Sequence, residues 1–154
     1  MNNSSNYEKQ LGHEKDMGTG TLSSNTCLIN DVSKAIIGEV HAFNFYKRLA
    51  ELAPIEQSRK KILSIRLDEV KHYHWFSMIL RGLGGQQPQI LTSPIPITYR
   101  EGVRKAIWDE SESAAFYKDI SYRATDLPTN KFFMDAAHDE QRHASWFQYM
   151  LIDL

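Results

Sequence analysis

The sequence has little cysteine, little net charge and no long apolar run, and each scarcity excludes a class of protein. The 154 residues include one cysteine, Cys27, which excludes a disulfide framework and a paired-cysteine metal site within the chain. The net charge is −1, without the basic excess that nucleic acid or an anionic membrane surface requires. No stretch reaches the roughly 18 consecutive apolar residues of a membrane span. A single domain in a reducing, cytoplasmic setting is expected.

Residues 1–30 are predicted to be a polar, disordered tail. The start of this segment is rich in Asn, Ser, Lys and Gly. Without helical periodicity, the tail cannot bury enough apolar surface to offset the cost of ordering. His13 and Cys27 fall within it and are interpreted as incidental. The predicted domain comprises residues 31–154.

Four stretches of this domain have the apolar spacing of amphipathic helices, with steps of three and four residues that keep one face apolar. They cover residues 32–53, 62–83, 103–124 and 133–154. Pro54 and Pro128 suit the turns within each pair. Residues 84–98 hold three prolines and two glycines, which exclude a regular helix. A connection of this length can run along a bundle, so the sequence predicts an all-α four-helix bundle with one long crossover.

The two predicted hairpins repeat each other at a constant offset of 71 residues. Over residues 34–80, 15 of 47 positions are identical to their counterparts, whereas ordinary composition would give roughly 3. Two unrelated amphipathic hairpins would match in apolar positions only. Here the matches also pair Glu39 with Glu110, Glu69 with Glu140, His72 with His143, and Trp75 with Trp146. A repeated hairpin implies a pseudo-twofold axis through the bundle.

Six polar residues occupy stripe positions that are otherwise mainly apolar. They are Glu39, Glu69, His72, Glu110, Glu140 and His143. A Glu and a His three residues apart project from the same helix face, so each E-x-x-H pair is expected to point into the core. A single such motif is weak evidence of metal binding. Two matched motifs with two matched glutamates fit the known ligand pattern of di-iron and di-manganese carboxylate bundles.

Electrostatics favours metal at such a cluster. Four buried carboxylates would carry a charge of about −4, and each buried ion costs several kcal/mol. Without metal they would have to take up protons. Two divalent cations would neutralise them, roughly 3.5–4 Å apart as in other two-metal sites. Carboxylate and imidazole ligands suit iron, manganese or zinc, and the same six residues are the candidate catalytic groups.

On these residues the sequence resembles the rubrerythrin and bacterioferritin branch of the ferritin-like superfamily. The resemblance covers residues 34–152. It rests on Glu39 and Glu110, from the first and third predicted helices, and on the segments 68–72 and 139–143. The second segment has the D-E-x-R-H form of bacterial-type di-iron carboxylate proteins, and the first has Lys71 in place of Arg. The resemblance implies a ferritin-like fold with two metal ions, iron being expected and manganese or zinc the alternatives.

The resemblance also implies supporting roles. In the family, the Asp before each ligand Glu supports the outer nitrogen of a ligand His, which makes Asp68 and Asp139 candidates. Ordinary surface acids are the alternative. Tyr46 and Tyr117 lie two turns after the first and third ligand glutamates. They would either hydrogen-bond a ligand carboxylate or fill the core.

Three functions are compatible with this resemblance. The first is an oxidoreductase acting on peroxide or oxygen. Rubrerythrins have an extra Glu where this chain has Ile107, and no cysteine pair is present for a rubredoxin iron, so electrons would come from a separate donor. The second is ferroxidase activity with iron storage or buffering, and the third is a non-catalytic, metal-stabilised interaction module. A homodimer is expected, with no nucleic-acid or membrane partner.

Overall fold

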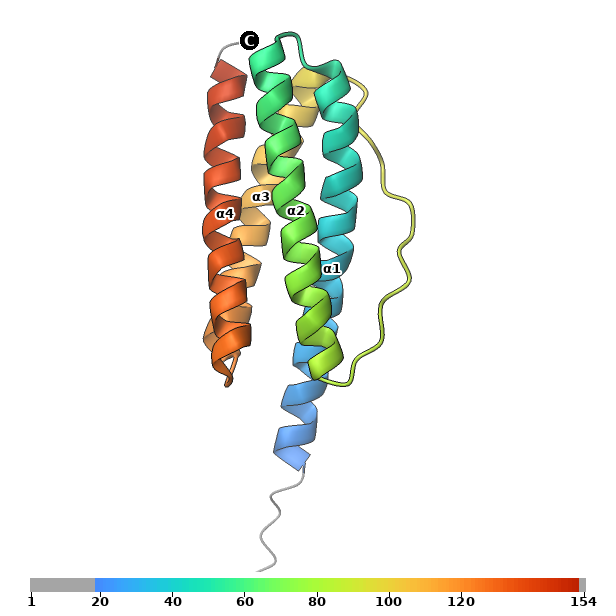
Figure 1. The fold of residues 1–154 in the computed structure, drawn as a ribbon, viewed down its shortest axis with the longest axis vertical. Helices are drawn as coiled ribbons and strands as arrows, with labels where there is room; N and C mark the ends of the chain where they lie inside the picture. The colour runs from blue at the N-terminus through green and yellow to red at the C-terminus, as the bar shows by residue number, and fades with distance from the viewer. Residues whose placement is uncertain (1–18, 153–154) are drawn as a thin grey trace, which may run out of the picture.

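The computed structural model describes residues 19–152. They form four helices, α1 (Thr19–Leu52), α2 (Glu56–Gly82), α3 (Tyr99–Arg123) and α4 (Leu127–Ile152). Figure 1 shows the helices side by side as a bundle, with α1 and α2 as one hairpin and α3 and α4 as the other. The predicted all-α bundle of two helical hairpins is confirmed. None of these helices is long and apolar enough to cross a membrane.

The connection between α2 and α3 runs along the outside of the bundle (Figure 1). It starts at a turn in which Gly84 has a φ of 78°, a conformation that glycine adopts without steric cost. It ends at Thr98, whose side chain accepts a hydrogen bond from the backbone N–H of Glu101 and so caps α3. Because the connection spans the bundle, α2 and α3 point the same way, as the long crossover predicted.

Helix α1 begins at Thr19, earlier than the expected boundary at residue 31. It therefore includes part of the segment expected to be a disordered tail. Leu28 and Ile29 are partly buried and pack against the core cluster that contains Val32, so the apolar stripe continues upstream among polar neighbours. Cys27 is exposed on this part of the helix. The rest of the expected tail, residues 1–18 with His13, lies outside the described residues.

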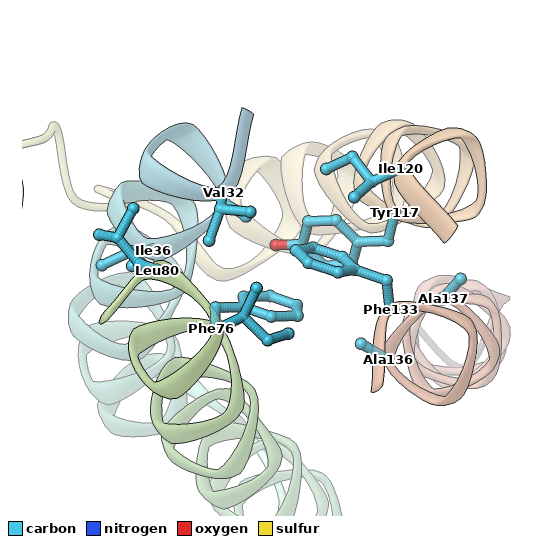
Figure 2. Packing of buried hydrophobic residues seen from close by; sticks show 11 residues of the cluster. Val32, Ile36, Phe76, Leu80, Tyr117, Ile120, Phe133, Ala136 and Ala137 are labelled. Atoms are coloured by element: carbon cyan, nitrogen blue, oxygen red, sulfur yellow. The ribbon is translucent and has the colours of Figure 1, made fainter. Parts of the chain in front are cut away.

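Two hydrophobic clusters form the core. Along each helix, the polar residues of the apolar stripe lie between residues of one cluster and residues of the other. One cluster includes Phe76 and Phe133, whose rings stack with centroids 4.2 Å apart. Figure 2 shows this pair with the ring of Tyr117 beside it. The other cluster includes Tyr46 and Phe147, at the opposite end of the stripes. This arrangement holds all four helices together on both sides of the polar residues.

Candidate metal centre

The structure brings the six predicted ligand residues together in the middle of the bundle. One comes from α1, two from α2, one from α3 and two from α4: Glu39, Glu69 and His72, Glu110, Glu140 and His143. None is more than 3% exposed. Their helical spacing explains this, because each lies on the apolar stripe that faces the core.

The six residues form two overlapping groups, each with one ligand atom per residue and all four atoms within 4.8 Å of one another. Glu39 and His72 belong to the first group, and Glu110 and His143 to the second. The remaining two glutamates, Glu69 and Glu140, belong to both groups. A carboxylate has two oxygens, so a shared Glu can bridge two ions. Two metal ions would be held by these residues, each by its own terminal carboxylate (Glu39 or Glu110) and by the two shared glutamates.

The centre also gathers buried polar atoms that lack a hydrogen-bond partner. They are both carboxylate oxygens of Glu69, Oε2 of Glu110, Oε1 of Glu140, and Nδ1 of His72 and His143. Nδ1 of His72 lies 2.9 Å from Oε1 of Glu140, but without the angles of a hydrogen bond. Buried polar atoms are normally satisfied. Oxygen and imidazole nitrogen atoms are ligands that suit iron, manganese or zinc, so a bound metal would satisfy these atoms.

Each histidine is oriented by an aspartate from the other hairpin. Nε2 of His72 lies 3.1 Å from Oδ2 of Asp139, and Nε2 of His143 lies 3.0 Å from Oδ2 of Asp68. A proton on Nε2, donated to the carboxylate, leaves Nδ1 as the free donor atom facing the centre. The structure thus places both aspartates where the supporting role expected from the family requires them.

Two cations hold these aspartates in turn. Nζ of Lys71 lies 2.8 Å from Oδ1 of Asp68 and 2.8 Å from Oδ2 of Asp139. Nη2 of Arg142 lies 2.7 Å from Oδ1 of Asp139 and 3.4 Å from Oδ2 of Asp68. Burial would raise the pKa of Asp139, but hydrogen bonds from His72 and Lys71 outweigh it and lower that pKa. The aspartates therefore stay ionised and acceptor-only beside the imidazoles.

Two buried tyrosines hydrogen-bond the terminal carboxylates. The hydroxyl of Tyr46 donates to Oε1 of Glu110, and that of Tyr117 donates to Oε1 of Glu39. Their rings also belong to the two core clusters, so both roles considered from the sequence apply. Burial, followed by the nearby carboxylates, raises the pKa of each phenol. Each tyrosine therefore keeps its proton and remains a donor.

The metal-free centre is expected to hold protons. Burial, followed by repulsion from neighbouring glutamates, raises the pKa of Glu69 and of Glu140 well above the ordinary value. Burial opposes protonation of His72, but its hydrogen bond to Asp139 and the nearby carboxylates of Glu39 and Glu69 raise its pKa to about 11. Metal ions compete with these protons for the same atoms, so metal binding should release protons.

A pocket of about 350 Å³ lies between α1 and α3 and reaches the glutamates of the centre. Its outer lining includes His41, Trp108, Asp109 and Glu112. The sequence did not single out these residues as functional, because they lie off the apolar stripes and look like ordinary surface positions. Residues on the outward face of a helix are not marked by apolar spacing. The sequence therefore does not reveal which of them line a pocket before the helices are placed side by side.

Comparison with known proteins agrees with this geometry. The family model described as Rubrerythrin matches residues 31–151. The uncharacterized protein YhjR of Bacillus subtilis (strain 168) is 38% identical over 128 residues, which cover 82% of this chain and 88% of that protein.

Two solved structures show the same fold. The bacterioferritin of Desulfovibrio desulfuricans, a protein with a di-iron site, aligns with a TM-score of 0.74 and 17% identity, covering 84% of this chain and 81% of that one. A hypothetical protein from Pyrococcus furiosus aligns with a TM-score of 0.71 and 21% identity, covering 81% and 88%. Because the family model matches most of the chain, and the candidate carboxylate centre agrees with it, this chain belongs to the rubrerythrin family of ferritin-like di-iron proteins.

Proposed function

We propose that this protein is a di-iron carboxylate oxidoreductase that reduces peroxide or oxygen with electrons from a separate donor. The observation that supports it is the sharing of Glu69 and Glu140 by two four-residue groups, which suits a coupled pair of ions better than one ion. Iron bound there would supply one-electron redox chemistry, and two ions match the two electrons that cleavage of a peroxide O–O bond requires. Manganese is the alternative redox metal, and zinc would be redox-silent.

The chain's own residues would position the ions and exclude bulk water. The imidazoles of His72 and His143 are held by aspartates, and the terminal carboxylates by tyrosine hydroxyls. Such preorganisation keeps the donor atoms in place while the metal charge changes. The pocket between α1 and α3 offers a small oxidant a path to the carboxylate side of the centre.

Ferroxidase activity with iron storage or buffering is the second candidate. It is favoured by the carboxylates that line the pocket, including Asp109 and Glu112, because they suit a cation as the incoming substrate. A non-catalytic, metal-stabilised module is the third candidate, and it predicts tight metal binding without a redox change.

The decisive experiment starts from metal-free protein loaded anaerobically with ferrous iron. Peroxide and oxygen are then added to separate samples, while near-ultraviolet absorption of ferric iron is followed and iron per chain is counted. Two irons per chain and faster oxidation by peroxide would support the peroxidase. Faster oxidation by oxygen, with retention of the product iron, would favour the ferroxidase. Failure to bind two ions would contradict the metal centre itself.

A variant and a control tie the reaction to these residues. Glu140→Ala removes a shared carboxylate and should abolish two-metal binding and oxidation together. Glu51→Gln changes an exposed carboxylate that pairs only with Arg48 among the described residues, and should leave both unchanged. Oxidation that survives in Glu140→Ala would mean that the reaction occurs elsewhere. The homodimer and the separate donor remain predictions, and light scattering after size-exclusion chromatography measures the assembly.

A further inference from the structure

The centre has a closed side between α2 and α4. There the imidazoles of His72 and His143 are backed by the two aspartates, and these are capped by Lys71 and Arg142. An incoming cation would have to break these ion pairs and pass two positive charges. Like-charge repulsion makes this side a poor route for a metal ion.

The side between α1 and α3 is open. The pocket there runs from the exposed residue Glu112 inward to all four glutamates of the centre. Three of these glutamates, Glu69, Glu110 and Glu140, have buried oxygens without a hydrogen-bond partner. The pocket therefore leads from the surface to glutamates whose unsatisfied oxygens are buried.

The rim of this pocket has an unbalanced charge. Both carboxylate oxygens of Asp109 lie 2.8 Å from Nζ of Lys105, so these two charges pair with each other. Glu112 is exposed and makes no ion pair with any residue in the described range 19–152. The free carboxylate leaves the rim negative, which raises the local concentration of cations and their rate of association.

A second opening, between α1 and α2, has mainly apolar walls. Its pocket reaches Glu39 and Glu69 past Val40, Phe43, Val70 and Tyr73. Mainly apolar walls cannot replace the water that a divalent ion must lose, so passage there is costly. This opening suits an uncharged molecule better than a cation.

We propose that divalent cations enter the centre through the pocket between α1 and α3, steered by the carboxylates of Glu112 and Asp109. This entry route depends on the proposed metal centre, but not on which reaction the loaded centre performs. It also assigns Lys105 a restraining role, because its ammonium neutralises Asp109 at the rim. Uptake should be governed by the rim charge and by the width of the pocket.

The test is the rate at which metal-free protein takes up Co²⁺, followed by stopped-flow absorption. Glu112→Gln should slow uptake about threefold at low ionic strength, and the difference should fade in high salt because the charge is screened. Lys105→Gln should accelerate uptake by leaving Asp109 unpaired. Glu56→Gln, at the start of α2 outside the lining of this pocket, is the control and should match the unaltered chain.

Two variants, each of which narrows one of the pockets, distinguish the two openings. A Cβ at Gly38 would lie 3.8 Å from the hydroxyl of Tyr117, an ordinary contact, so a side chain can begin at this position. Gly38 lines the α1/α3 pocket, and Gly38→Leu should narrow it. Val40→Phe narrows the α1/α2 pocket instead. Slower uptake in Gly38→Leu alone supports the proposal, and slower uptake in Val40→Phe alone overturns it.

The equilibrium count of cobalt keeps the two proposals apart. Two Co²⁺ per chain in every variant, with rates that follow the rim charge, supports both the centre and the route. Two Co²⁺ per chain with rates indifferent to Glu112, Lys105 and Gly38 overturns the route and leaves the centre standing. No bound Co²⁺ in the unaltered chain overturns the metal centre.

Discussion

The hydroxyl of Tyr46 donates a hydrogen bond to the carboxylate of Glu110, 64 positions further along the chain. The repeat supplies its counterpart, a hydrogen bond from Tyr117 back to Glu39. Each hairpin thus holds a terminal carboxylate of the other. The centre is shared between the hairpins, and neither hairpin alone contains a complete group of ligands.

Tyr46→Phe should weaken metal binding without abolishing it. The substitution removes the donor to Glu110 but keeps the ring in the core, so two ions should still bind, with about 10-fold lower affinity at the affected position. Competition with a chelator measures the change. Tyr117→Phe, its repeat counterpart, should weaken the other position by a similar amount. Unchanged affinity in both variants would mean that the tyrosines serve packing alone.

Asp139→Asn should lower metal affinity about 10- to 100-fold, because the carboxylate that orients His72 loses its charge. Asp68→Asn should affect the ion held by His143 instead, since the two aspartates serve different histidines. Cobalt titrations should therefore show one weakened ion in each variant. Asp135→Asn, on the surface of α4 beside Lys131, is the matched control. Equal weakening of both ions by either variant would contradict the crossed pairing.

The fold and the clustering of the six candidate ligand residues could be predicted because they follow from spacing along one helix. Glu69 and His72 share a face whatever the neighbouring helices do, and the repeat offset identified the equivalent pair and the two remaining glutamates. The long proline-containing connection then limited the order of the helices. These inferences need no knowledge of side-chain contacts between helices.

Contacts between helices could not be predicted in the same way. Spacing does not reveal that His72 is supported by Asp139 of α4 rather than by its own neighbour Asp68. The early start of α1 was also missed, because Leu28 and Ile29 stand among polar residues and their burial depends on the other helices. Which residues form the pocket rim depends on which outward faces of α1 and α3 meet, and the sequence pattern does not predict that contact.

Gly102→Ala should destabilise the protein by about 1–3 kcal/mol through overpacking. A Cβ at this position would lie 2.6 Å from Cδ1 of Leu49 and 2.8 Å from Cβ of Pro96. The close approach joins α1, the end of the crossover and the start of α3, the helix that carries Glu110. Gly82→Ala is the control, since nothing lies within 4 Å of its added Cβ. Urea denaturation of both variants measures the difference, and equal stability would show that the contact relaxes freely.

Removal of metal should make stability fall as the pH rises from mildly acidic to alkaline values. The folded pKa values of Glu69 and Glu140 lie well above the ordinary 4.5, and that of His72 is about 11 against an ordinary 6.5. A group with a raised folded pKa contributes stability that is complete below its unfolded pKa and is lost as the pH rises through the folded value. All three groups therefore favour the folded state less at pH 9 than at pH 6.

The acid limb has the opposite sign. Hydrogen bonds from Lys71 and from the histidines outweigh burial and lower the pKa values of Asp68 and Asp139. Their contribution to stability is complete above the ordinary pKa of 3.8 and is lost as the pH falls through the lowered pKa values of the folded protein. Metal-free protein should thus be most stable at mildly acidic pH, and urea midpoints across the pH range measure this. Metal-loaded protein should not lose stability at alkaline pH, because bound cations replace the protons. A urea midpoint of the metal-free protein that rises from pH 6 to pH 9 would contradict the charge balance of the centre.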